Sequence, residues 1–259
     1  MSTILFDKIV FGPIHSRRLG VSLGINLLPV DGKLCSFNCI YCECGLNETH
    51  RTRTALPTRE EVKEALIEKL ASMQKEGIAP DVITFAGNGE PTIHPKFAGI
   101  IDDTIEVRNR FFPKAKIAVL SNATQIDKEE VFQALNKIED NILKLDSVLD
   151  SRIQQLDCPN SPSFTFEKLL KGLKRFQGNL IIQTMFLKGE YQGKSVDNTT
   201  DKEITGWLDA LKEIKPKQVM IYTIDRETPV KGLRKASSEE MEAIAEKARK
   251  EGFNVTVSL

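Results

Sequence analysis

Short runs rich in β-branched residues alternate with longer stretches of helical pattern along most of the chain. The compact apolar runs predict strands that are buried on both faces. We expect strands at residues 21–28, 81–86, 116–120, 142–145, 179–186, 218–223 and 253–257. The stretches between them predict helices at residues 58–75, 97–110, 127–137, 164–176, 201–213 and 237–251.

Helix ends carry local signals. Thr58 and Glu61 have the S/T-x-x-E spacing of a capping box, so a helix is expected to begin there and to end at Gly77. Asp127 is expected to be the N-cap of a later helix. Two segments, 150–163 and 190–200, show no such pattern, and we predict irregular connections that could cover a site.

Strands that alternate with helices of this length predict βαβ units and an α/β fold with a parallel sheet. Six such strands precede the last helix. The periodicity fits a curved partial barrel and a flat doubly wound sheet equally well. No linker rich in Pro, Gly or Ser divides the sequence, so we expect one domain over residues 1–259.

Composition narrows the function. The chain has 259 residues, a common length for one α/β barrel domain. Lys and Arg number 36, as do Asp and Glu, which argues against a dominant nucleic-acid surface but permits a local basic groove. No apolar run approaches the ~20 residues that span a bilayer, so no membrane association is expected. The absence of an apolar signal segment before the cysteines predicts a reducing, cytoplasmic location.

Cys35, Cys39 and Cys42 stand in one short segment with the sequence CSFNCIYC. Thiolates at this spacing can fold around one corner of an iron–sulfur cube. A [4Fe–4S] cluster normally takes four thiolates, so three leave one iron without a protein ligand. An open coordination position is what distinguishes a catalytic metal site from a structural one.

Two other uses of the cysteines were weighed. A structural zinc site needs four ligands, and only Cys44 and His50 lie near enough in sequence to add to the three. A disulfide framework conflicts with the odd count of five cysteines. Cys44 and Cys158 are too few for a second cluster with a full set of thiolates, and a free thiol is the simpler reading of each.

The C-x3-C-x2-C spacing, with Tyr41 directly before the last cysteine, resembles the motif of the radical S-adenosylmethionine (SAM) superfamily. GP-x-x-SRRLG-x-SLG-I-N ahead of it, with LKLD and YTIDR downstream, is similar to stand-alone proteins related to the radical SAM domain of the wybutosine-synthesizing tRNA-modifying enzymes. This resemblance implies a partial (βα)6 TIM-like barrel. It implies an N-terminal extension at 1–20, the core barrel at 21–225, and a C-terminal helix and strand at 226–259.

The resemblance also implies a chemistry. Cys35, Cys39 and Cys42 would hold a [4Fe–4S] cluster whose open iron is chelated by the methionine moiety of SAM. The reduced cluster would cleave SAM to a 5′-deoxyadenosyl radical, which abstracts hydrogen from an unidentified substrate, as in an oxidoreductase-type enzyme. An electron donor such as flavodoxin or ferredoxin is implied. The substrate stays open between a small molecule, a peptide or protein, and RNA. The alternative is an iron–sulfur electron-transfer or sensing protein that does not use SAM.

The segment GNGEPT follows the second strand, at an edge where parallel α/β folds gather reactive groups. Gly87 and Gly89 permit a close approach of backbone to a ligand, and Glu90 offers a carboxylate. The segment resembles the GGEP motif of the family, with Asn88 in place of a glycine. The resemblance implies that it holds the SAM amino group, largely through backbone carbonyls. The alternative is an ordinary strand-to-helix turn.

Polar residues also end the next strands. Asn122 can bond a ribose hydroxyl or a carboxylate, or can simply begin a turn. Lys144 and Asp146 share one face of a strand, where burial would require partners such as SAM, the substrate or each other. The backbone of Tyr41 is expected to meet the adenine. Further inward polar candidates are Gln183, Thr184, Tyr222 and Asp225.

Paired arginines precede the first predicted strand. Arg17 and Arg18, beside Ser16 and Gly20, suit an anionic group. A charged surface turn is the alternative. With Lys144, they are candidates for contacts with a carboxylate or a phosphate.

Overall fold

Eight strands form the central sheet of this protein, in the order β1-β2-β3-β4-β5-β6-β9-β11. The structure is a computed structural model that describes residues 4–16 and 19–259, so the candidates Arg17 and Arg18 lie outside the described residues. From β2 to β11 all neighbouring strands are parallel, as predicted, whereas β1 pairs antiparallel with β2. The strands are β1 (Val10–Ser16), β2 (Gly20–Ile25), β3 (Val82–Phe85), β4 (Lys116–Ser121), β5 (Asp140–Lys144), β6 (Ile181–Met185), β9 (Gln218–Tyr222) and β11 (Val255–Ser258).

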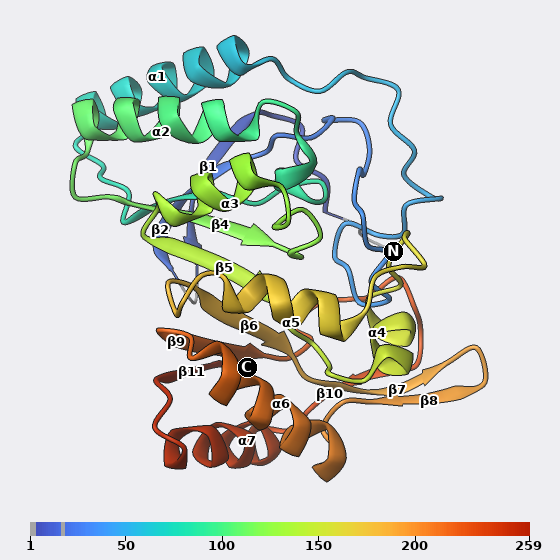
Figure 1. The fold of residues 1–259 in the computed structure, drawn as a ribbon. Coiled ribbons are helices and arrows are strands. Elements are labelled where there is room, and N and C mark those ends of the chain that lie inside the picture. The colour runs from blue at the N-terminus through green and yellow to red at the C-terminus, as the bar shows by residue number, and fades with distance from the viewer. Residues whose placement is uncertain (1–3, 17–18) are drawn as a thin grey trace.

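The sheet curls, and the main helices wrap around its outer face (Figure 1). These helices are α1 (Arg59–Glu76), α2 (Phe97–Phe111), α3 (Glu129–Asn136), α5 (Phe166–Lys174), α6 (Asp201–Ile214) and α7 (Ser238–Lys250). Their apolar faces bury the outer side chains of the strands in the largest hydrophobic core. All six helices therefore correspond to predicted ones. Within the described part of the chain, no helix is both long and apolar enough to cross a membrane.

The inner face of the curled sheet changes character along the strands. Val82, Ala118, Ile142, Ile181 and Met220, one from each of five neighbouring strands, form a small apolar core there. Because side chains alternate along a strand, the residues two positions further on face the same way. On β5, β6 and β9 those positions are polar, so the inner face of the sheet becomes polar where the small apolar core ends.

Side-chain capping explains where α1 begins but not where α3 begins. Thr58 and Glu61 form the predicted capping box of α1, and Gly77 ends the helix in the left-handed conformation at φ 72°. The prediction that Asp127 caps α3 is wrong, because the N-cap is Lys128 and no side chain bonds there. A turn in which Lys128 N donates to Gln125 O at 3.0 Å delays the start of the helix.

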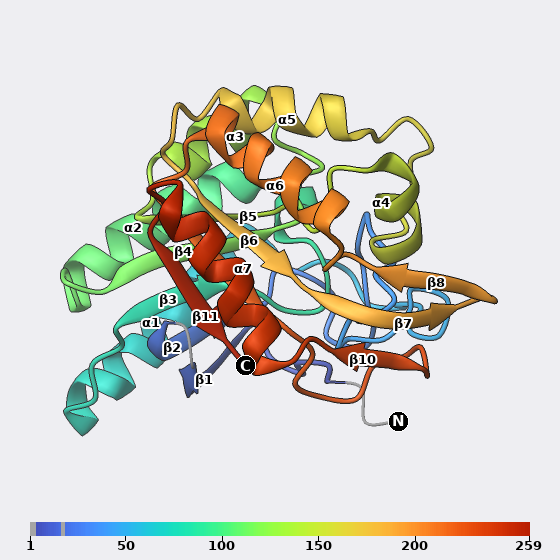
Figure 2. The ribbon, with the colours of Figure 1, turned by 90° about the horizontal axis from the view of Figure 1, so that it is seen from below.

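Both segments that were predicted to be irregular contain regular structure. Helix α4 (Asp150–Leu156) occupies the first and is too short to show a helical period in the sequence. The second lies mostly in a hairpin of β7 (Leu187–Tyr191) and β8 (Lys194–Asp197), which β10 (Leu233–Lys235) extends into a separate three-stranded sheet, here called the accessory sheet (Figure 2). Gln192 and Gly193 both have positive φ, as the tight hairpin turn requires.

Residues 35–42, here called the cysteine loop, lie against α4 and the accessory sheet. Phe37, Ile40 and Tyr41 are buried with Leu187 and Val196 in a second hydrophobic core. The backbone is fixed as well, because Ile40 N donates to Leu156 O at 3.0 Å and Asn38 N to Asp157 O at 3.0 Å. The loop is thus held from outside the main sheet.

Candidate active site

The three motif cysteines line one cavity of about 240 Å³ at the carboxyl ends of the parallel strands. All five cysteines of the chain are free thiols. Six of the eight predicted cofactor residues line the same cavity, namely Tyr41, Gly87, Gly89, Glu90, Asn122 and Lys144. The fold therefore brings together residues that are spread over more than a hundred positions of sequence.

Burial controls the protonation of the thiols. It raises the pKa of Cys35 to about 12, with help from the Glu90 charge, and raises that of Cys39 well above its ordinary value. The hydrogen bond from the Cys44 thiol, with the nearby Lys33 ammonium, lowers the pKa of Cys42 to about 5. A buried thiol loses its proton when a metal supplies the compensating charge. Among the described residues, no three His, Cys, Asp or Glu side chains converge as the ligands of a single ion would.

Lys33 is a cationic neighbour of the thiols that the sequence analysis missed. Its side chain is 3% exposed, and its Nζ donates to the carbonyl of Gly45 at 2.6 Å. Burial works against its charge, but the charges of the three motif cysteines outweigh burial and raise the pKa of Lys33. The only sequence signal was a basic residue two positions before the first cysteine.

Glu90 joins the ends of β3 and β4 rather than projecting a free carboxylate into the cavity. One oxygen accepts hydrogen bonds from Thr92 N at 3.0 Å and Ser121 Oγ at 2.8 Å, and the other accepts from Asn122 N at 2.6 Å. The group is 2% exposed, and burial raises its pKa. Glu90 therefore fixes the backbone on which Asn122 stands.

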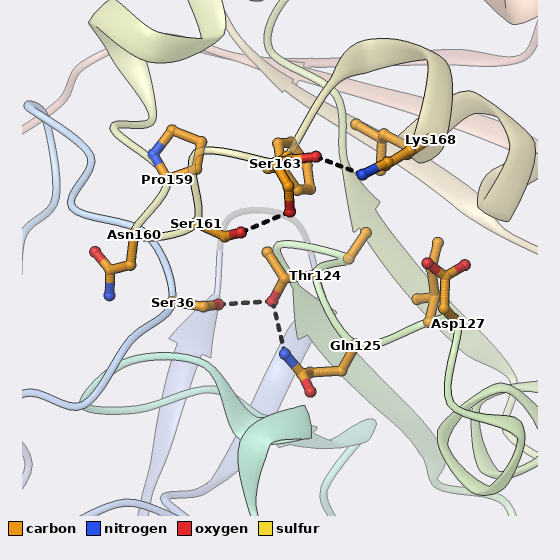
Figure 3. A pocket seen from close by; sticks show the side chains of 13 residues that line it. Ser36, Thr124, Gln125, Asp127, Pro159, Asn160, Ser161, Ser163 and Lys168 are labelled. Atoms are coloured by element: carbon orange, nitrogen blue, oxygen red, sulfur yellow. Dashed lines mark hydrogen bonds between the residues drawn. The ribbon is translucent and has the colours of Figure 1, made fainter.

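Asn122 closes a turn after β4, as one alternative had it, and its amide also contacts the cysteine loop. Its Oδ1 accepts from Thr124 N at 3.1 Å, which closes a turn, while its Nδ2 donates to Ser36 Oγ at 2.9 Å and lies 3.6 Å from Cys35 Sγ. Ser36 also bonds Thr124 Oγ1 at 2.6 Å, on the wall of a polar cavity of about 420 Å³ beside the cysteine loop (Figure 3). The turn after β4 thus touches the cysteine loop directly.

Asn88 and Gly89 anchor the segment after β3 to the residues that precede the first cysteine. The Asn88 side chain is fully buried and bonds Pro29 O at 2.9 Å, away from the cavity, while its carbonyl accepts from Leu34 N at 2.9 Å. Gly89 has φ 137°, and a Cβ there would stand 1.9 Å from Leu34 O. The neighbouring carbonyl of Gly87 faces the cavity and accepts from the Cys44 thiol at 3.4 Å.

A buried network of ionisable groups reaches Cys39. Lys144 Nζ lies 3.0 Å from Asp146 Oδ2, so these residues form the mutual ion pair that was one alternative. The Tyr41 hydroxyl bonds both of them, so the side chain of the tyrosine is part of this network. Asp157, in a segment predicted to be irregular, lies 3.8 Å from Lys144 Nζ and 3.6 Å from Cys39 Sγ.

Burial and neighbouring charges together shift the pKa values of this network. Burial opposes the charge of Lys144, but the neighbouring Asp146 carboxylate outweighs it and raises the pKa of the lysine. Burial and the Asp146 charge raise the pKa of Asp157 well above its ordinary value. The network therefore joins the Lys144–Asp146 ion pair to Asp157, whose neutral form burial favours.

A second cavity of about 250 Å³ adjoins the first and shares five residues with it, namely Tyr41, Cys42, Leu120, Gln183 and Tyr222. Asp225 and Arg226 line its outer side, where Arg226 Nη1 lies 2.7 Å from Glu43 Oε2. Gln183, Tyr222 and Asp225 thus face the cavities as expected. Thr184 does not, because its hydroxyl bonds Leu145 O and Trp207 Nε1 beneath α6.

Known proteins share the sequence pattern of this chain. Residues 30–192 match the family model described as Radical SAM superfamily. The chain is 32% identical over 243 residues to a protein of Brachyspira hyodysenteriae named GTPase Obg, a match that covers 92% of this chain and 33% of that one. It is 32% identical over 229 residues to a UPF0026 protein of Helicobacter pylori (strain J99), covering 86% of this chain and 68% of the relative.

Solved structures share its fold. SuiB of Streptococcus suis bound to S-adenosylmethionine superposes with a TM-score of 0.65 at 15% identity, covering 90% of this chain and 50% of SuiB. A radical SAM methyltransferase from Sphaerobacter thermophilus gives 0.66 at 16% identity, covering 92% and 65%. TYW1 with a lysine-pyruvate adduct gives 0.61 at 15% identity, covering 88% and 73%. The predicted partial TIM-like barrel is confirmed.

Proposed function

The chain belongs to the radical SAM superfamily, and from that premise we propose that it is an enzyme that uses a reduced [4Fe–4S] cluster to cleave SAM. The observation that carries the proposal is the single cavity shared by three free thiols and by polar residues on or just after five neighbouring strands. An electron-transfer protein would need the thiols but would give the strand ends no role.

The donor set fits the cluster. Cys35, Cys39 and Cys42 are free, lie on one wall, and have the buried Lys33 ammonium beside them to balance thiolate charge. When bound, cluster and SAM together supply homolytic cleavage of a carbon–sulfur bond, which yields methionine and the 5′-deoxyadenosyl radical. Flavodoxin or ferredoxin is the class of electron donor that we propose.

The chain's own residues would orient SAM. The Gly87 carbonyl faces the cavity and accepts from Gly89 N at 2.9 Å and from the weaker thiol donor of Cys44, so a protonated amine could replace Cys44 there. Asn122 offers an amide beside Cys35, and the Lys144 ammonium is already fixed by Asp146. Because the second cavity shares Tyr222 and Gln183 with the first, we infer that the substrate enters there.

The test is anaerobic reconstitution of the chain with iron and sulfide, followed by reduction. Electron paramagnetic resonance (EPR) spectra are recorded with and without SAM, and 5′-deoxyadenosine is assayed. A [4Fe–4S]⁺ signal that changes on adding SAM, with 5′-deoxyadenosine formed, supports the proposal. A cluster that does not respond to SAM would indicate electron transfer instead, and stoichiometric zinc without a cluster would contradict the proposal outright.

A further inference from the structure

Lys33 carries a buried positive charge with no carboxylate to balance it. Its side chain is 3% exposed and its Nζ donates to Gly45 O, yet across residues 4–16 and 19–259 no carboxylate forms an ion pair with it. Other well-buried cations of this fold have such partners, because Lys144 lies 3.0 Å from Asp146 Oδ2 and Arg108 lies 3.1 Å from Glu139 Oε1. An unpaired buried ammonium is costly, so a counter-charge from another source is required.

The nearest candidates for that counter-charge are the sulfur atoms of the cysteine loop. Lys33 Nζ donates to Gly45 O at 2.6 Å and Gly45 N donates to Cys42 O at 2.9 Å, which places the ammonium beside the turn that carries Cys42, and the nearby cysteines raise the pKa of Lys33. A neutral thiol offers little compensation, whereas a thiolate bound to iron carries a full share of negative charge. Three iron-bound thiolates would therefore balance the charge of Lys33 more fully than the metal-free thiols, of which Cys42 alone has a lowered pKa.

The backbone fixes this charge in place. Lys33 N donates to His50 O at 2.7 Å, and the next residue, Leu34, donates to Asn88 O at 2.9 Å. The acceptor of the ammonium, Gly45, belongs to a turn in which Gly45 N donates to Cys42 O at 2.9 Å. The side chain thus contacts the turn after the last cysteine, while its backbone is fixed before the first one.

We propose that Lys33 is a positioning residue that acts as the fixed counter-charge of the cluster and makes its reduction easier. This inference rests on the proposed function. One electron passes from a flavodoxin- or ferredoxin-class donor to the oxidised cluster, whose charge falls from 2+ to 1+, while Lys33 keeps its proton. A nearby cation stabilises the more negative reduced state, since net charge and hydrogen bonds to sulfur set the potentials of such clusters.

The experiment compares the reconstituted full chain with the variants Lys33→Met and Lys33→Arg. Each is titrated anaerobically with dithionite in the absence of SAM, and the reduced fraction is read by EPR. For Lys33→Met we expect the ratio of reduced to oxidised cluster at a fixed potential to fall about tenfold, which for one electron is ~59 mV. Lys33→Arg keeps the charge and should stay within about threefold of the parent.

The outcomes separate this inference from the proposed function. A parent protein that forms no [4Fe–4S] signal would defeat the proposed function itself. A parent that forms and reduces the cluster, beside a Lys33→Met variant of unchanged potential, would overturn the inference alone. If Lys33→Met retains too little iron to titrate, thermal unfolding of the metal-free proteins decides. A metal-free variant as stable as the parent supports the inference, and one that unfolds at clearly lower temperature would show a purely structural role.

Discussion

Cys39 is set in place by contacts that a cysteine motif alone does not reveal. Its thiol lies 3.6 Å from Asp157 Oδ1, and Asp157 lies within 3.8 Å of Lys144. Lys144 and Asp146 in turn bond the Tyr41 hydroxyl; Tyr41 and Asp146 are buried, and the Lys144 side chain is 18% exposed. Fully satisfied networks of this kind make a local structure rigid. The position of this ligand is therefore preset before any metal binds.

Replacement of Cys39 should abolish the metal site. In Cys39→Ala we expect most of the iron to be lost on desalting and SAM cleavage to fall by more than roughly 100-fold, because one thiolate ligand is gone. Iron content and 5′-deoxyadenosine formation are the measurements. Cys158→Ser is the matched control, since Cys158 lies outside both cavities that adjoin the motif and its thiol only donates to Gln155 O at 3.6 Å. A Cys39→Ala protein that still made 5′-deoxyadenosine would contradict the assignment.

Substitution of Gly89 tests the stability of the fold rather than catalysis. In Gly89→Ala the new Cβ would stand 1.9 Å from Leu34 O at a φ of 137°, so the residues before the first cysteine must move. We expect unfolding free energy to fall by about 3 kcal/mol, measured by urea denaturation. Gly193→Ala is the control, because its φ of 71° is also positive but nothing lies within 4 Å of the new Cβ. A loss there of about 1 kcal/mol would reflect backbone strain alone; equal losses in the two variants would refute the steric argument.

At the scale of elements, the sequence predicts the helices and strands that have a strong hydrophobic period and misses the strands that lack one. The seven parallel strands and their helices follow from apolar runs and from caps such as Thr58. Strand β1 was missed, because VFGPIHS contains no apolar run or clear alternation. The accessory sheet was missed too, since its strands are short and mostly polar and its third strand comes from a distant part of the chain.

The residues of the candidate site likewise fall into those that the sequence predicts and those that it does not. Residues at strand ends could be predicted to meet, because parallel strands present their carboxyl ends at one edge. Asn88 shows the limit of this reasoning, since its side chain packs behind the segment that it helps to form. Lys33 and Asp157 could not be predicted, because each reaches the thiols through loop packing that no local pattern encodes.

An ion pair between two helices gives a pH-dependent prediction. Arg59 Nε of α1 donates to Asp103 Oδ2 of α2 at 2.5 Å, and this bond, with help from Lys63, lowers the pKa of Asp103 below 3.8. A carboxyl with a lowered folded-state pKa stabilises the fold above its unfolded-state value, and that stability disappears as pH falls through the folded-state value.

Asp103→Asn should therefore cost about 1 kcal/mol of unfolding free energy at pH 7, a modest loss because Arg59 is 41% exposed. The difference between parent and variant should shrink as the pH falls below 3.8. Urea denaturation of both proteins at pH 7 and at pH 3 measures it. A difference that stayed constant over this range would mean that packing of Asp103, and not its charge, links the helices.

Over the whole molecule, the cysteine loop stands between two hydrophobic cores. The larger one joins the sheet to its outer helices, and the smaller one joins the cysteine loop to α4 and the accessory sheet. Cluster binding by the cysteine loop should therefore depend on the smaller core far more than on the larger one. The GNGEPT segment, by contrast, follows β3 of the main sheet.

Two valine truncations test this division. Val196 is fully buried in the smaller core, and Val62 is 1% exposed in the larger one. Each Val→Ala change should lower unfolding free energy by about 2 kcal/mol through lost burial and a small cavity. Only Val196→Ala should also lower the iron retained after reconstitution. Equal iron retention in both variants would show that the accessory sheet does not support the cysteine loop.

The dependence of the cysteine loop on the smaller core has a consequence for synthesis of the chain. The loop emerges early from the ribosome, yet Leu156, Val196 and Val230, which hold it, are made much later. Until then its thiols are exposed and unconstrained, because their partners do not yet exist. If the cluster forms as proposed, delivery of iron and sulfide must therefore follow synthesis of the chain through Val230, and a ribosome-bound fragment that ends before the accessory sheet should remain unable to keep a cluster.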